Sequence, residues 1–129
     1  MRKSLVKKIY KAGIVKGAGR GKRIGVPTIN LDPLTAGDLK HGIYVCRVLR
    51  PFEYWGVMHF GPRPTYDDNE PSLEVYLFDF DMLLDLPNEI DLEIHTYIRG
   101  IEKFNNTKDM LKMIEKDIDK AKKIIGNLT

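Results

Sequence analysis

The chain has 129 residues, of which 43% are hydrophobic and 30% charged, as in an ordinary globular protein, and we expect one domain over residues 1–129. Cys46 is the single cysteine and lies in an apolar run, which predicts a buried thiol in a reducing compartment. No apolar stretch approaches the roughly 18 residues that span a bilayer, and the basic N-terminus lacks a signal peptide's apolar segment. We therefore expect a cytoplasmic monomer that binds no membrane. The net charge of +3 suits a phosphate-bearing ligand and is too small to predict nucleic-acid binding.

Segments typical of strands fill the first three quarters of the chain. They are short, rich in β-branched and aromatic residues, and separated by turns that contain proline, glycine or asparagine. The expected strands are Lys8–Lys16, Val26–Leu31, Ile43–Leu49, Tyr54–Phe60, Leu73–Phe80 and Ile90–Ile98. Because no helix separates them, we expect a six-stranded antiparallel sheet closed into a barrel, which leaves no unpaired edge.

The last quarter of the chain changes its hydrophobic period. Apolar residues there recur at spacings of three and four, the pattern of one helical face. They are Met110, Leu111, Ile114, Ile118, Ala121 and Ile125. Asn106 is the expected N-cap, Asp109 favours the first turn, and Gly126 is the expected C′ residue. The predicted fold is therefore mainly β, with one C-terminal α-helix packed on the barrel.

Glycines alternate with basic residues in a segment near the N-terminus. The segment contains Gly17, Gly19, Arg20, Gly21, Lys22, Arg23 and Gly25. Glycine lets backbone amides approach a ligand closely, and the cations add charge, so the segment suits phosphates. Its spacing nevertheless matches neither the Walker motif nor the dinucleotide fingerprint. A phosphate-binding loop and a hairpin loop with cationic tips both fit this pattern.

The residues from Pro27 to Asn30 favour the phosphate-binding interpretation of this segment. Pro27 keeps the preceding residue extended, and in a strand Thr28 and Asn30 point to the same side. A hydroxyl and an amide oxygen are neutral donors that Mg²⁺ accepts beside nucleotide phosphates. The alternative is a polar strand face at the rim of a barrel.

Glu74 is the carboxylate that we single out. Strand geometry places Leu73, Val75 and Leu77 on one side, where they read as core, and Glu74 on the other side with Tyr76, Phe78 and Phe80. A carboxylate beside aromatic rings is suited to act as a general base next to a ring-binding surface. An exposed strand glutamate is the competing interpretation.

These landmarks together resemble the riboflavin kinase family. The segment from Gly13 to Asn30 is similar to the family pattern G-x-V-x-G-x-G-R-G-x-x-L/I-G-x-P-T-A-N. The resemblance covers about residues 10 to 125 and keeps the family's order of motifs. It continues through Gly42–Tyr44, Gly56–Val57, Gly61–Tyr66, Leu73–Val75 and Arg99–Phe104.

The resemblance implies a six-stranded barrel that transfers the γ-phosphoryl group of ATP to riboflavin and forms FMN. It implies Glu74 as the catalytic base and Thr28 and Asn30 as ligands of the nucleotide-bound metal. Nucleotide contacts are expected from Gly17, Gly19, Arg20, Lys22, Gly25, Val26, Pro27, Thr28 and Asn30. Flavin contacts are expected from Arg63, Tyr76, Arg99 and Phe104. ATP against another triphosphate, and Mg²⁺ against Mn²⁺ or Zn²⁺, stay open.

The chain also departs from the family pattern, and one other function fits it. Asp85–Asn88 replaces the family's D-L-Y-G turn, and Glu102 stands one place later than the glutamate in the family's R-x-E-x-K/R-F. With only about ten residues before the kinase region, we expect no FAD synthesis. The histidines, including His59, have no metal-ligand spacing and are expected to be structural. A small basic barrel that binds single-stranded nucleic acid is the competing function, although Glu74 interrupts its aromatic face.

Overall fold

The computed structural model describes residues 5–16, 27–66, 68–81 and 85–128. Within these residues six strands and one α-helix form, with two short 3₁₀ helices. The strands are β1 (Leu5–Gly13), β2 (Ile29–Leu31), β3 (Gly42–Arg50), β4 (Tyr54–Arg63), β5 (Asp68–Leu77) and β6 (Glu89–Arg99). The helices are η2 (Pro33–Ala36), η3 (Pro64–Tyr66) and α2 (Thr107–Gly126). No helix among the described residues is long and apolar enough to cross a membrane.

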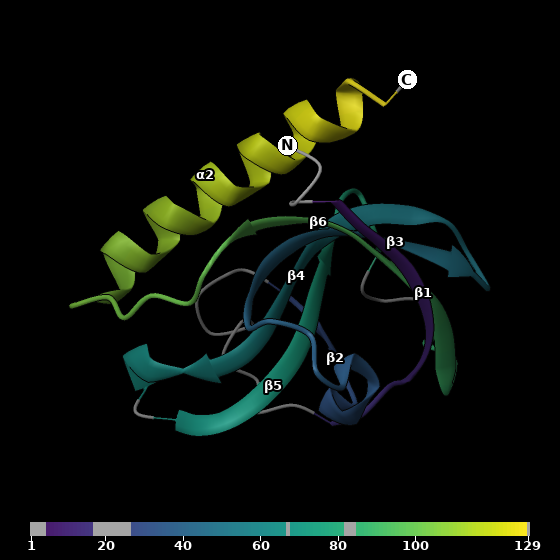
Figure 1. The fold of residues 1–129 in the computed structure, drawn as a ribbon, viewed down its shortest axis with the longest axis horizontal. Coiled ribbons are helices and arrows are strands. Elements are labelled where there is room, and N and C mark those ends of the chain that lie inside the picture. The colour runs from purple at the N-terminus through teal and green to yellow at the C-terminus, as the bar shows by residue number, and fades with distance from the viewer. Residues whose placement is uncertain (1–4, 17–26, 67, 82–84, 129) are drawn as a thin grey trace.

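All strand pairs are antiparallel, and the strands follow the order β1-β6-β3-β4-β5-β2 in one curved sheet (Figure 1). The edge strands β1 and β2 meet through an isolated bridge between Ile14 and Leu31. Two backbone hydrogen bonds of 2.9 Å flank this bridge, from Val15 to Asn30 and from Asp32 to Gly13. The predicted six-stranded antiparallel sheet is thus confirmed, but its closure into a barrel is limited to this short contact.

The central strands are buried on both faces. Tyr44, Cys46 and Val48 point into the interior of the curved sheet, while Ile43 and Val45 point to the opposite face, under α2. This arrangement explains why β3 is apolar from Ile43 to Cys46 on both faces, because a strand that is covered on both sides needs no polar face. Cys46 has no exposed surface, as predicted.

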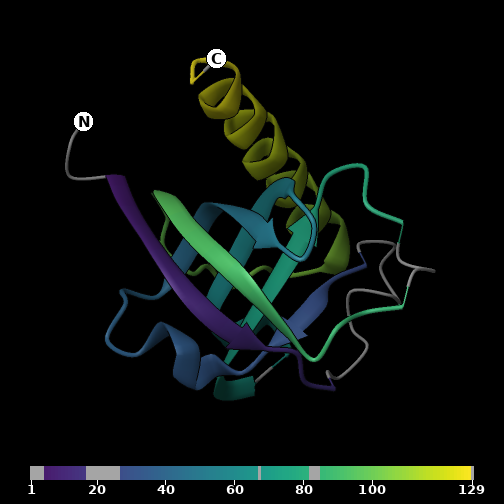
Figure 2. The same ribbon diagram turned by 90° about the vertical axis from the view of Figure 1, so that its right-hand side faces the viewer.

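Helix α2 covers the outer face of the sheet and contacts β3, β4 and β6 (Figures 1 and 2). The predicted N-cap is confirmed, since the Asn106 side chain accepts a hydrogen bond from the Asp109 amide at 2.8 Å. The predicted C-terminus is wrong by two residues, because a C′ residue at Gly126 would place the C-cap at Ile125. Gly126 lies inside the helix, and Asn127 is the C-cap with φ of −76°, so the helix needs no left-handed residue to end.

Several strand boundaries also differ from the prediction, and β5 begins at Asp68 rather than at Leu73. Strand β4 continues past Phe60, because Gly61 adopts a φ of +136° that lets the chain bend without leaving the sheet. Strand β5 ends at Leu77, and the turn carries Phe80 back onto Phe52 and Tyr54 in the interior. Phe80 therefore does not share the face of Glu74. At the N-terminal side, β1 ends at Gly13 rather than Lys16, and the described part of the second strand is Ile29–Leu31.

Candidate active site

Three neighbouring strands place polar side chains in one row across the sheet. Glu74 on β5 pairs with His59 on β4 and with Asn30 on β2. Residues that are directly opposite in an antiparallel pair point to the same face. The fold thus gathers a carboxylate, an imidazole and an amide from segments that lie far apart in the sequence.

The Glu74 carboxylate is bound on both oxygens by side chains of the same region. Its Oε1 accepts a hydrogen bond from the Thr28 hydroxyl at 2.9 Å. Its Oε2 accepts from the Nε atom of Arg63 at 2.7 Å and from the Ser72 hydroxyl at 3.1 Å, with the Arg63 Nη2 atom at 2.6 Å. Glu74 retains only 9% of its exposed surface, so it is a buried, paired carboxylate and not a solvated strand residue.

These contacts keep Glu74 charged. Burial on its own raises the pKa of the carboxyl, because it penalises the charged form. The Arg63 guanidinium and the hydrogen bonds from Thr28 and Arg63 oppose this and leave the pKa below its usual value. Glu74 is therefore an ionised proton acceptor at neutral pH.

His59 lies beside this cluster as a neutral imidazole. Burial, followed by the nearby Arg63, lowers the pKa of His59 to about 4. Its Nε2 atom lies 3.2 Å from the Pro62 carbonyl oxygen, which only a protonated ring nitrogen can bond. The Nδ1 atom is then an unprotonated acceptor, and it is buried without a hydrogen-bond partner among the described residues. The sequence prediction of a merely structural histidine missed this position in the site.

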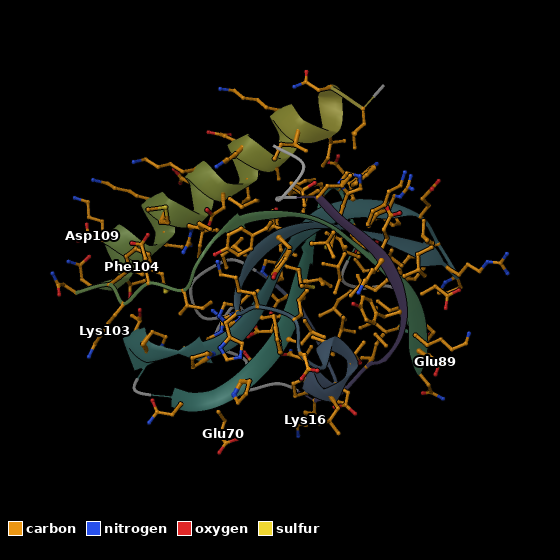
Figure 3. All side chains as sticks on the ribbon, viewed as in Figure 1. Lys16, Glu70, Glu89, Lys103, Phe104 and Asp109 are labelled. Carbon is orange, nitrogen blue, oxygen red and sulfur yellow. The ribbon has the colours of Figure 1, made fainter. Side chains whose placement is uncertain are left out.

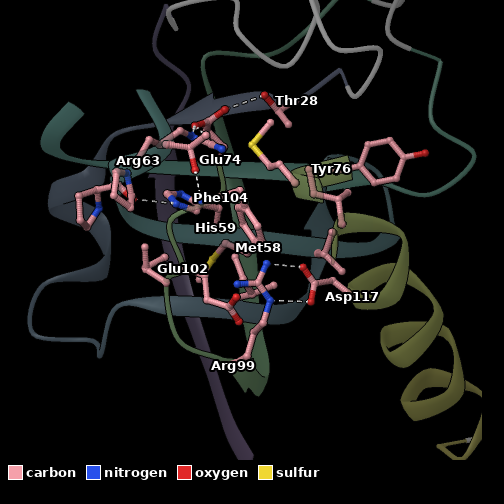
Figure 4. Close-up of a pocket in the computed structure, with 18 residues that line it drawn as sticks. Thr28, Met58, His59, Arg63, Glu74, Tyr76, Arg99, Glu102, Phe104 and Asp117 are labelled. Carbon is pink, nitrogen blue, oxygen red and sulfur yellow. Dashed lines mark hydrogen bonds and ion pairs between the residues drawn. The ribbon is translucent and has the colours of Figure 1, made fainter. Parts of the chain in front are cut away.

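Glu74 and His59 open onto a pocket between the sheet and the first turns of α2 (Figure 4). The pocket contains about 870 Å³ of space, including its open mouth. Its walls are mostly apolar side chains, with polar groups gathered at the two ends. The apolar lining includes Ile43, Val57, Met58, Tyr76, Ile101, Phe104, Met110 and Ile114. A mostly apolar pocket with a few convergent polar groups is the usual form of a small-molecule site.

The far end of the pocket is held by a second arginine–carboxylate pair. Arg99 on β6 donates from Nε to Asp117 Oδ1 at 2.8 Å and from Nη2 to Oδ2 at 2.7 Å. Its Nη1 atom donates to the Gly100 carbonyl at 2.9 Å. Asp117 is 4% exposed and lies on α2, so this pair joins the helix to the sheet.

The other residues expected on the flavin side also reach this pocket. Tyr76 is two residues after Glu74 on the same face of β5 and lines the pocket wall. Phe104 lies between the two arginine–carboxylate pairs in Figure 4. The Phe104 amide donates to the Thr65 hydroxyl at 3.0 Å, and the Arg99 guanidinium lies 6.0 Å from the ring centre. Figure 3 shows Phe104 beside the N-terminal end of α2, near Asp109. Arg63, Tyr76, Arg99 and Phe104 thus share one cavity.

The residues expected to bind nucleotide are only partly described. Pro27, Thr28 and Asn30 are partly buried, and Thr28 lines the pocket. The remaining predicted contacts lie outside the described residues; they are Gly17, Gly19, Arg20, Lys22, Gly25 and Val26.

The sequence analysis also missed Ser72 and Asp117. Ser72 is two residues from Glu74 on the same strand face, so period-two spacing could have found it. Asp117 lies in the apolar stripe of α2, between Ile114 and Ala121, where a carboxylate needs a buried partner. His59 gave no such signal. It pairs with Glu74 through the register of β4 against β5, and this register cannot be read from the sequence.

The arrangement fits a metal ion that arrives with phosphates. Among the described residues, no group of three or more histidine, cysteine or acidic side chains could hold a metal alone. Thr28 and Asn30 both border Glu74, one through its hydrogen bond and one through strand register, and both offer neutral oxygens. Two neutral oxygens suit a divalent cation whose negative ligands are nucleotide phosphates.

Comparisons with known proteins agree on one family. An RNA-binding riboflavin kinase of Bacillus subtilis is 37% identical over 108 residues, which are 81% of this chain and 46% of that protein. The riboflavin kinase of Homo sapiens is 31% identical over 119 residues, covering 85% of this chain and 76% of the human protein. The chain spans less than half the length of the bacterial relatives that it matches.

Two further comparisons cover most of the chain. A crystal structure described as a macrolide-efflux protein from Streptococcus pneumoniae superposes with a TM-score of 0.67 and 27% identity, over 87% of this chain and 37% of that one. The family model Flavokinase, described as riboflavin kinase, matches residues 7–125. The chain therefore belongs to the riboflavin kinase family.

Proposed function

We propose that this chain transfers the γ-phosphoryl group of ATP to the 5′-hydroxyl of riboflavin and so forms FMN. The observation that carries the proposal is the position of Glu74, an ionised carboxylate at one end of an apolar pocket, bonded to Thr28 and opposite Asn30. Family membership supplies the reaction class, and the pocket supplies a wall for a planar ring system.

In this proposal Glu74 accepts the proton of the ribityl hydroxyl as its oxygen attacks phosphorus. A positioned general base contributes about 10²- to 10⁴-fold, while phosphoryl transfer depends mainly on positioning and charge. Thr28 and Asn30 would hold a Mg²⁺ ion, which when bound neutralises the phosphates and aligns them. The neutral oxygens of Thr28 and Asn30 beside Glu74 support this assignment, and Mn²⁺ and Zn²⁺ are the alternative metals.

The apolar part of the pocket suits the isoalloxazine ring. Tyr76 and Phe104 offer aromatic surface, and Arg63 and Arg99 border the same space with polar edges. Excluding water from such a site strengthens the electrostatic interactions that act on the reacting groups. We assign the nucleotide to the Thr28 end, because Thr28 follows the glycine- and cation-rich segment in the sequence.

Single-stranded nucleic-acid binding is the second candidate function. The observation in its favour is that the Bacillus subtilis relative is named an RNA-binding riboflavin kinase. A steep dependence of oligonucleotide binding on salt, without turnover of a nucleoside triphosphate, would support this alternative.

The proposal is tested by incubating the purified chain with riboflavin, a divalent metal and each nucleoside triphosphate, and by separating FMN chromatographically. We expect FMN with ATP and Mg²⁺, and the other triphosphates and metals serve as specificity controls. No FMN with any donor would overturn the proposal.

Two variants assign the roles within the site. Glu74→Gln should retain nucleotide binding and lower kcat by about 10²- to 10⁴-fold, because it removes only the proton acceptor. Asn30→Ala should weaken the use of metal-nucleotide and recover partly at high metal or nucleotide concentration. Near wild-type FMN formation by Glu74→Gln would remove it from the base role, and an Asn30→Ala variant that is insensitive to both concentrations would contradict its place at the metal.

A further inference from the structure

The two oxygens of Glu74 are held very differently. Oε2 accepts from three donor atoms, which are Arg63 Nε and Nη2 and Ser72 Oγ, at 2.6 to 3.1 Å. Among the described residues, Oε1 accepts from the Thr28 hydroxyl alone, at 2.9 Å. A carboxylate oxygen has about two lone-pair sites, so Oε2 is saturated while Oε1 keeps one site open.

The chain path explains how Arg63 reaches Oε2. Arg63 pairs with Asp68 in the sheet and not with Glu74, and the register of β4 and β5 shifts between Gly61 and Arg63. The positive φ of Gly61 accompanies this irregularity. Prolines on both sides of Arg63 stiffen its backbone, and His59 binds the carbonyl of one of them, Pro62. Arg63 thus approaches from a restrained bend.

Ser72 adds a second restraint from the same strand as Glu74. Its hydroxyl lies on the Glu74 face, two residues away, and is within 3.5 Å of the Gly61 carbonyl and 3.1 Å of Oε2. Donors from two strands therefore converge on one oxygen atom. Two N–H groups of one guanidinium, with a hydroxyl beside them, fix the carboxylate plane as well as its position.

We propose that Arg63 and Ser72 are positioning residues, which lock Oε2 of Glu74 and so present Oε1 as the oxygen that takes the proton. The inference rests on the proposed function and assigns the task to one atom of its base. It also gives Arg63 a role other than binding flavin.

The transfer changes bonds at the substrate hydroxyl oxygen, at phosphorus and at Oε1 of Glu74. The substrate hydroxyl oxygen forms its bond to phosphorus, the bond from phosphorus to the leaving nucleoside diphosphate breaks, and the hydroxyl proton passes to Oε1. Arg63 keeps its own protons throughout, and Oε2 still accepts its bonds when Glu74 is protonated. The proton leaves Oε1 for solvent as FMN departs.

The charges around Glu74 determine what removal of Arg63 does. Arg63 and His59 face it from β4, Thr28 and Asn30 from the β2 side, and Ser72 from β5. Three more charged residues line the same pocket; they are Arg99, Glu102 and Asp117. Arg63 is the charged group that bonds the carboxylate, so its removal should free the Glu74 side chain to move.

The test compares Arg63→Met, Arg63→Lys and Ser72→Ala with the matched control Arg50→Met, which removes an exposed arginine from the far end of β3. For Arg63→Met we expect kcat on the pH plateau to fall about 10- to 100-fold with little change in KM for riboflavin. Arg63→Lys should restore part of the lost kcat. Ser72→Ala should show a smaller fall in kcat, and Arg50→Met none.

Each other outcome counts against the proposal. A rise in KM for riboflavin with an unchanged kcat would make Arg63 a flavin ligand. A loss of thermal stability with unchanged kinetics would make it structural. NMR relaxation of the ¹³C-labelled Glu74 carboxyl at one neutral pH needs no substrate, so it tests the hold on Oε2 even if the wild-type chain forms no FMN. Unchanged relaxation of this carboxyl in Arg63→Met would overturn the proposal by itself.

Discussion

The pocket contains two arginine–carboxylate pairs that differ in how completely they are satisfied. Asp117 meets Arg99 in a fork, with one donor on each oxygen, and the Nη1 atom of Arg99 also donates to the Gly100 carbonyl. Glu74 receives both Arg63 donors on a single oxygen, and its other oxygen faces Thr28. Asp117 is 4% exposed and Glu74 9%, so burial does not separate the two pairs.

The difference lies in what each carboxylate can still do. A bidentate pair between β6 and α2 is complete, and it fixes the helix that forms one wall of the pocket. Glu74 receives three donor atoms on one oxygen and, among the described residues, only the Thr28 hydroxyl on the other, which leaves an acceptor site there. The same two residue types therefore connect a helix to the sheet at one end of the pocket and form the proposed general-base site at the other.

The largest effect on stability should come from removing one member of the Arg99–Asp117 ion pair. Asp117→Ala leaves the Arg99 guanidinium, which is 18% exposed, without its partner, and removal of one member of a buried ion pair costs about 3 to 5 kcal/mol. We expect a loss of this size in the free energy of unfolding, measured by urea denaturation. Riboflavin binding should weaken too, because α2 carries part of the pocket wall.

The matched control replaces both members of the Arg99–Asp117 ion pair. The double variant Arg99→Met with Asp117→Leu removes the charges together, and it should recover much of the stability that Asp117→Ala loses. Glu74→Gln should not behave in this way, since the amide oxygen can still accept from Arg63. Equal destabilisation by Asp117→Ala and Glu74→Gln would show that the Arg99–Asp117 and Arg63–Glu74 pairs do not differ in the way described.

The next largest effect is the loss of stability that His59, which lies beside Glu74, causes at low pH. Burial and Arg63 hold the pKa of His59 at about 4, below its ordinary value of 6.5. The unfolded chain therefore binds more protons than the folded chain between these values, and stability falls as the pH is lowered from 6.5 to 4. A shift of this size corresponds to up to about 3 kcal/mol. Urea denaturation at half-unit steps of pH measures it.

A variant without the imidazole isolates this effect. His59→Asn should flatten the decline in stability between pH 6.5 and 4.5 and leave the contribution of His95, whose pKa is also lowered by burial. Glu74 contributes its own loss only below its ordinary pKa of 4.5. An undiminished slope in His59→Asn above pH 4.5 would show that His59 is not the group that resists protonation.

Much of the fold follows from the sequence, because its strands carry strong local signals. Alternation or continuous apolar runs identified all six strands, and the spacing of α2 identified its buried face. The errors lie where tertiary contacts decide. Gly61 bends β4 without ending it, Phe80 turns back into the interior, and the barrel closes only between Ile14 and Leu31.

The site was predictable only as separate residues. Glu74, Thr28 and Asn30 carry local motifs, and the structure brings Thr28 and Asn30 to Glu74. His59, which pairs with Glu74 from the other side of β5, lies 15 positions from it in the sequence and has no motif, since only the β4–β5 register places the two together. Likewise, the sequence offers Arg63 and Arg99 as similar flavin contacts, and only the structure separates their carboxylate partners.

The smallest expected effect tests whether the two ends of the pocket are independent. Asn106 caps α2 through the Asp109 amide, and loss of an N-cap side chain costs about 1 kcal/mol. Asn106→Ala should lower stability by that amount, while the neighbouring exposed Asn105→Ala serves as the control and should change little. Because the cap belongs to the helix that carries Asp117 and not to the strands that hold Glu74, the pKa of Glu74 should stay unchanged in both variants. A shifted Glu74 titration in Asn106→Ala would mean that α2 transmits strain to the reactive carboxylate, and the two pairs would then have to be treated as one coupled unit.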